Sequence, residues 1–187
     1  MLEKLSSKKK IILVGYVGLE GSLKIAKEKE EELESYFSKH FMNQIKKCKK
    51  YLISPQVLLE MKEKEGNKEE HERDVFITLG GDGKCKSLWS ALWNFSETYK
   101  TGFEIESSLI PIRQETIEIC QFVRLNPYQL SSGGSYLIIS SQWEDVMLKL
   151  REERVVSEVI GETTRNKARL IKRRDDIRHL PRPKAME

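Results

Sequence analysis

Short apolar runs, each followed by a glycine-rich turn, are the feature that most limits how this chain can fold. Residues 11–17 form one run before the turn at 18–21, and residues 74–78 form another before the turn at 80–83. Each turn leads into a stretch whose apolar residues recur at helical spacing. This order predicts two units of strand, glycine turn and helix.

The helix after the first turn is expected to be amphipathic and to pack on a sheet. Its apolar positions are Leu23, Ala26, Leu33 and Phe37. Further helices are expected at 41–52, from 55 onward, at 88–95, at 114–123 and at 142–154, and further strands at 102–106, 135–140, 155–161 and 168–171. Some strands are joined by short links and others by helices, which predicts an α+β domain with a mixed sheet.

The length of 187 residues is enough for one good core and short for two ordinary domains. We expect a polar extension at 1–10, a single domain at 11–173 and a basic irregular tail at 174–187. Within the domain, residues 62–73 have almost no apolar side chain to bury, so we expect a mobile surface connection there.

The chain is expected to be cytoplasmic, because no apolar run approaches the roughly 20 residues that a membrane helix needs. Residues 1–10 are polar and basic and lead into no signal-peptide core. The cysteines Cys48, Cys85 and Cys120 lie far apart, which favours reduced structural thiols and no metal site.

Candidates for acid–base chemistry are weak. The histidines His40, His71 and His179 are scattered among charged segments, and surface positions are expected for them. Glu104 and Glu106 would share one face of a strand, where they more plausibly solvate a sheet edge than transfer protons. No catalytic residue is assigned.

The net charge of +4 is small but unevenly placed, since basic residues crowd positions 165–184. Such a tail can bind a phosphate backbone. Interleaved aromatic residues and nucleic-acid motifs are absent, so a solvated tail is favoured over nucleic-acid binding.

Five sequence segments carry a family resemblance, at 16–33, 110–120, 125–134, 159–163 and 181–183. Their order resembles the C-terminal domain of hydrogenase-maturation-factor-like proteins in the aminoimidazole-ribonucleotide synthase (PurM-like) superfamily, and the match spans nearly the whole chain. The resemblance implies a layered α/β/α domain with a mixed, largely antiparallel sheet. In the family this domain closes over an N-terminal half that carries the metal and nucleotide ligands.

The sequence departs from the family in ways that affect chemistry. Nothing before Ile11 is long enough to supply the N-terminal half, so we expect no cofactor for the isolated chain, and ATP with magnesium only if a separate chain supplies that half. The terminal cysteine used by hydrogenase-maturation enzymes is also missing at Glu187. Their dehydration reaction is therefore not carried over.

Two glycine loops are the candidate anion-binding sites, because backbone N–H groups in such turns can hold phosphate. The family pattern Asp-x-Thr-x-Gly-Gly corresponds to residues 76–81, with Phe76 in place of the acid. The family also places its serine-glycine segment beside this loop. The candidates are Thr78, Gly80, Gly81, Ser131, Ser132, Gly133 and Gly134. The alternative is that both loops are ordinary turns.

Three functions remain open. The favoured one is a non-catalytic ligand-binding or assembly module, expected to form a homodimer through an apolar sheet or helix face that the missing half would cover. The second is one subunit of a split ATP-dependent enzyme, with a separate ATP-binding chain. The third is a nucleic-acid-binding module that uses the basic tail.

Limited trypsin digestion tests the expected mobile segment. Residues 62–73 bury too little apolar surface to offset their ordering entropy, so trypsin should cut there first. Early cleavage elsewhere, with this segment intact, would contradict the prediction.

Overall fold

The computed structural model describes residues 8–52, 55–64, 73–81 and 83–183. Its sheet has seven strands in the order β2-β4-β1-β5-β3-β6-β7. The strands are β1 Lys10–Val14, β2 Val75–Thr78, β3 Gly102–Glu106, β4 Tyr136–Ser140, β5 Ser157–Thr164, β6 Arg169–Arg173 and β7 Asp176–His179. β3 and β6 pair in parallel, and the other neighbouring strands pair antiparallel. The expected α+β class with a mixed, largely antiparallel sheet is confirmed.

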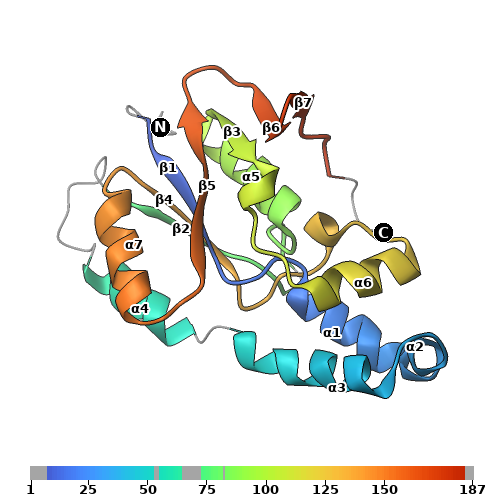
Figure 1. Ribbon diagram of the computed structural model, residues 1–187. Coiled ribbons are helices and arrows are strands. Elements are labelled where there is room, and N and C mark those ends of the chain that lie inside the picture. Colours follow the sequence, from blue (N-terminus) through green and yellow to red (C-terminus); the bar gives the residue numbers. More distant parts are fainter. Residues whose placement is uncertain (1–7, 53–54, 65–72, 82, 184–187) are drawn as a thin grey trace.

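Helices cover the sheet on both sides (Figure 1). They are α1 Leu19–Glu28, α2 Glu30–Tyr36, α3 Lys39–Lys47, α4 Pro55–Lys64, α5 Leu88–Tyr99, α6 Gln114–Val123 and α7 Trp143–Glu152, with the 3-10 helices η1 Cys48–Tyr51, η4 Ser107–Leu109 and η5 Pro127–Gln129. Helix α5 packs on one face, and α4 and α7 pack on part of the other. Among the described residues, no helix is long and apolar enough to span a membrane.

The central strand β1 explains the layered arrangement. Ile11 and Leu13 point into the core beneath α5, whereas Ile12 and Val14 point into the core beneath α4 and α7. All four side chains are fully buried, at 0% exposure. Because successive strand residues face opposite sides, an uninterrupted apolar run requires cover on both faces.

The expected packing of the first helix on the sheet is wrong. Lys29 adopts a non-helical backbone and divides the helix into α1 and α2. Ala26 and Leu33 pack against α3 and against Ile119 of α6. These four helices form a separate helical layer beyond the ends of the strands, at the lower right of Figure 1.

The expected start of the irregular tail needs correction, whereas the mobility of residues 62–73 stays a prediction. The tail was expected to be irregular from residue 174, but residues 176–179 form β7. β7 pairs antiparallel with β6, and this pairing satisfies backbone N–H and C=O groups of both strands. Helix α4 continues to Lys64, inside the segment expected to be mobile, and residues 65–72 lie outside the described residues.

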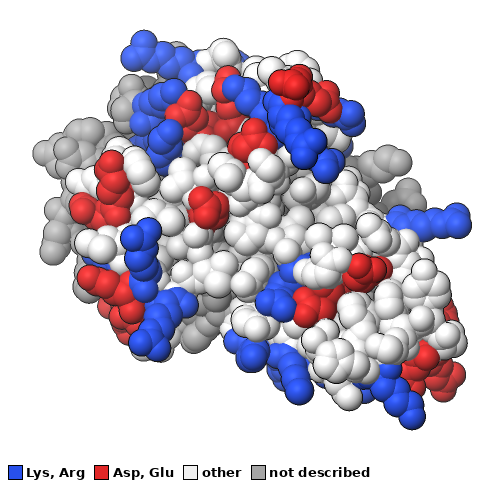
Figure 2. Space-filling model, in the orientation of Figure 1, with Lys and Arg blue, Asp and Glu red and all other residues white. Residues whose placement is uncertain are grey.

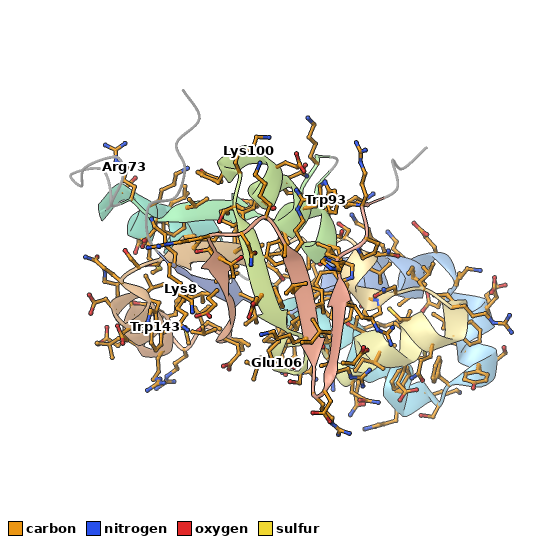
Figure 3. The ribbon with its side chains drawn as sticks, turned by 90° about the horizontal axis from the view of Figure 1, so that it is seen from above. Lys8, Arg73, Trp93, Lys100, Glu106 and Trp143 are labelled. Atoms are coloured by element: carbon orange, nitrogen blue, oxygen red, sulfur yellow. The ribbon has the colours of Figure 1, made fainter. Side chains whose placement is uncertain are left out.

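Charged side chains occupy the part of the sheet that α4 and α7 leave uncovered. Among the described residues, the core beneath α4 and α7 includes no side chain from β3, β6 or β7. Glu104 was expected at a sheet edge, but its strand β3 lies between β5 and β6, so that expectation is wrong. It pairs with Lys172, and Glu162 pairs with Lys10 at 2.8 Å. In Figure 3, Glu106 and Trp143 lie on this side of the sheet and Trp93 lies on the other.

Gly161 provides a test of this architecture. A β-carbon there would collide with the backbone carbonyl of Glu104 on the neighbouring strand. We expect Gly161→Ala to lower the free energy of unfolding by about 2–4 kcal/mol, because neither strand can move without breaking pairing. Denaturant unfolding measures this. Gly83→Ala is the control, since a β-carbon there has no neighbour within 4 Å; an equal loss in both variants would contradict the explanation.

Candidate anion-binding edge

Three chain segments meet at one end of the sheet. Because β4 runs antiparallel to both β1 and β2, the start of β4 lies beside the ends of the other two strands. The turn at 15–18, the loop residues 79–81 and 83–87 and the segment at 130–135 are therefore neighbours. We call residues 18–21, 78–81 and 131–135 the glycine edge.

Backbone hydrogen bonds hold the two predicted loops together. The Leu79 N–H donates to the Ser135 carbonyl at 3.0 Å, and the Ser132 N–H donates to the Lys86 carbonyl at 3.0 Å. Gly80 lies so close to Gly133 that a β-carbon at position 80 would be 2.6 Å from the Gly133 nitrogen. The expected side-by-side arrangement of the loops is therefore present.

The start of α1 is fastened to the same place. The Gly18 N–H donates to Ser132 Oγ at 2.9 Å, and the Gly21 N–H donates to the Ser131 carbonyl at 2.9 Å. Gly18 has φ +72, a left-handed conformation that favours glycine, and a β-carbon there would be 2.8 Å from the Pro127 carbonyl oxygen. This close approach brings the first turn of α1 onto the serine-glycine segment.

Glu20 is the side chain that joins these segments. Its Oε2 accepts hydrogen bonds from Ser131 Oγ and from the Gly133 N–H, the latter at 2.9 Å. Its Oε1 pairs with Lys24 Nζ at 2.9 Å. Burial alone raises the pKa of Glu20, but the hydrogen bonds from Ser131, Lys24 and Gly133 outweigh it and lower the pKa from its ordinary value.

The structure distributes the predicted site residues over different environments. Gly80 donates its N–H to the carbonyls of Cys85 and Lys86, at 3.2 and 3.1 Å, and the Gly133 N–H is taken by Glu20. Thr78 and Gly81 are exposed, and Ser131 and Ser132 are buried. Gly81 and Gly134 have positive φ values of 69° and 80°.

Sequence reasoning missed Glu20 and Lys24. An acidic residue in the first turn of a helix is common because it complements the helix dipole, so Glu20 carried no special signal. Its partners lie 111 and 113 positions away in the chain. Only the tertiary structure brings them together.

Phe76, which replaces the acid of the family pattern, points away from the loops. It lies in β2 opposite Ile138 and packs against the core beneath α4 and α7. An apolar ring at this position strengthens the sheet and offers nothing to a ligand at the glycine edge.

The cysteines show the features of structural thiols. All three are free, and Cys48 and Cys120 are buried. Burial raises the pKa of Cys120 to about 11, so this thiol is protonated at neutral pH. Among the described residues, no group of three or more His, Cys, Asp or Glu side chains could hold a metal ion.

Comparison with known proteins identifies the fold. No protein-family model and no curated protein matches the sequence. Among solved structures, E. coli HypE, a hydrogenase maturation protein, is 16% identical with a TM-score of 0.67 and covers 95% of this chain. A HypE–HypF complex gives 15% identity, a TM-score of 0.63 and 94% coverage. Thiamine monophosphate kinase from Aquifex aeolicus is 14% identical, with a TM-score of 0.53, and covers 89% of this chain.

The chain spans about half the length of these proteins, covering 51% of E. coli HypE, 53% of the chain in the complex and 50% of the kinase. HypE and the kinase are both members of the aminoimidazole-ribonucleotide synthase superfamily. The resemblance found in the sequence is therefore confirmed at the level of the fold.

Glu20→Ala tests the role of the carboxylate. The variant leaves Ser131 Oγ and the Gly133 N–H without their acceptor, so we expect a loss of about 1–3 kcal/mol in the free energy of unfolding. Glu31→Ala, an exposed position on α2, is the matched control and should change stability little. Equal effects at both positions would contradict the joining role.

The same contact predicts a pH dependence. The pKa of Glu20 is lowered by folding, so its stabilisation is present above the ordinary value of 4.5 and is lost as the pH falls through the lowered value. The stability difference between wild type and Glu20→Gln should therefore shrink in acid. Denaturant unfolding at several pH values measures it, and a difference that grows below pH 4.5 would refute the assignment.

Proposed function

We propose that this chain is a non-catalytic ligand-binding or assembly module related to hydrogenase maturation proteins. It binds neither ATP nor magnesium on its own. One observation carries the proposal: the donors of the serine-glycine segment are engaged by Glu20 of the same chain. Donors that already bond within the chain hold the domain together and are not available to bind a nucleotide.

The binding part of the proposal concerns small anions at the glycine edge. Gly81 is exposed, and a β-carbon there would have no neighbour within 4 Å, so its backbone is accessible. Gly80 and Gly133 already donate within the protein. Anion binding is therefore weak and unselective, with Gly81 as the main contact.

A split ATP-dependent enzyme is the second candidate. The matched solved structures include HypE in complex with ATP and a thiamine monophosphate kinase with AMPPCP and TMP, and this chain spans about half of each. In this alternative another chain supplies the nucleotide-binding half. Magnesium-dependent ATP binding that appears only after such a chain is added would favour it.

Ion pairs at two of the basic residues between positions 165 and 184 weaken the nucleic-acid interpretation. Arg169 pairs with Glu97 and lies over the ring of Trp93 at 3.9 Å, and Lys172 pairs with Glu104. Cations that already pair with carboxylates of the same chain gain less from a phosphate backbone, which binds through charge neutralisation.

Calorimetry and NMR together test the proposed function. The purified chain should show no micromolar binding of ATP with magnesium and no ATP hydrolysis. Tight magnesium-dependent binding by the chain alone would overturn the non-catalytic assignment.

Phosphate titration tests the anion site separately. Amide shifts are expected at Gly81 first, then among Gly80, Gly133 and Gly134. Gly102 and Gly161, which lie within the sheet, serve as internal controls and should not move. Unchanged amides throughout the glycine edge would remove anion binding from the proposal.

A further inference from the structure

Four aromatic rings gather at the free end of the helical layer. The Phe37 ring stacks on Phe41 with 4.4 Å between centroids and lies 5.9 Å from Phe122. Tyr36 completes the group, 4.8 Å from Phe37 and 5.0 Å from Phe122. We call these four residues the aromatic tip.

The aromatic tip presents apolar surface to solvent. Tyr36 is 69% exposed, more than any other large hydrophobic side chain among the described residues. A single exposed apolar residue is ordinary, but Tyr36 contacts the rings of Phe37 and Phe122, and Phe37 in turn stacks on Phe41. These three further rings are only partly buried. Tyrosine is also enriched at the centres of protein interfaces.

The two helices that meet at the aromatic tip carry opposite charges. Glutamates occupy positions 28, 30, 31, 32 and 34, whereas lysines occupy positions 39, 46, 47, 49 and 50, with no acidic residue between 35 and 59. We call the segment with these glutamates, residues 28–34, the acidic arm and the segment with these lysines, residues 39–50, the basic arm. Phe37 and Ser38 connect α2 to α3, so both arms extend from the aromatic tip. In Figure 2, white surface at the lower right is bordered by both red and blue side chains.

Some of these charges are paired within the chain. Lys46 pairs with Glu30 at 2.5 Å, and Lys29 pairs with Glu32 at 3.0 Å. Glu31, Glu34, Lys39 and Lys47 are exposed. These four side chains remain accessible to a partner on the two arms.

We infer that the aromatic tip binds a second copy of this chain. In a two-fold dimer the same patch faces itself, so Tyr36 packs on the partner's rings while the acidic arm of each copy meets the basic arm of the other. A patch with an apolar centre and both charges in adjacent strips is complementary to its own copy.

The rest of the surface supports this location. An apolar sheet or helix face was expected to form the dimer, and the uncovered half of the sheet instead carries the paired charges of Glu104, Lys172, Glu162 and Lys10. Figure 2 shows red and blue side chains intermixed at the top of the view. The inference rests on the assembly part of the proposed function and leaves anion binding untouched, because the glycine edge is at the opposite end of α1 from the tip.

Sedimentation velocity and light scattering on the full chain test the tip. Wild type should dimerise, and Tyr36→Glu should weaken dimerisation by about 30-fold or more. Leu148→Glu is the matched control, because Leu148 is 55% exposed on α7, far from the tip, and dimerisation should not change. A strictly monomeric wild type, or a dimer insensitive to Tyr36→Glu, would overturn the inference.

A charge exchange provides a second test that does not alter the rings. One variant carries Glu31→Lys and Glu34→Lys, and the other carries Lys39→Glu and Lys47→Glu. Each alone should dimerise more weakly than wild type, because like charges then face each other. Mixing the two should restore a mixed dimer that weakens with added salt. Absence of mixed dimers would place the contact elsewhere, while the phosphate titration of the glycine edge would be unaffected.

Discussion

Burial of β1 on both faces is the constraint on which the rest of the structure depends. Ile11 and Leu13 require α5 on one side, and Ile12 and Val14 require α4 and α7 on the other. Pairing with β4 and β5 satisfies the backbone of β1 on both edges. The antiparallel pairing with β4 also brings the start of β4 to the end of β1, which creates the glycine edge.

Close backbone approach and a single carboxylate then define that edge. Gly80 and Gly133 touch where no side chain could fit, and Glu20 collects the donors of Ser131 and Gly133. A loop pair of this kind can either bind a ligand or stabilise the domain through internal hydrogen bonds. The hydrogen bonds of Glu20 favour the stabilising role, so the proposed ligand site is limited to the exposed backbone near Gly81.

The proposed anion-binding surface and the proposed dimerisation surface have different physical origins. Backbone groups at the strand ends supply the glycine edge, whereas the aromatic tip arises because the helical layer extends beyond the sheet and leaves Tyr36 without cover. A dimer through the tip leaves the glycine edge accessible. Assembly and anion binding are therefore separable properties, each open to its own measurement.

The sequence by itself determined the α+β class, the positions of most strands and helices and the two glycine loops, because period-2 and period-3.6 apolar patterns and glycine turns are local signals. It also carried the resemblance from which the observed fold was expected. The tertiary structure alone decided that α1 joins a helical layer, that residues 176–179 pair as β7 and that Glu20 reaches Ser131. Each of these depends on contacts between residues distant in the chain, and such contacts leave no periodic pattern along it.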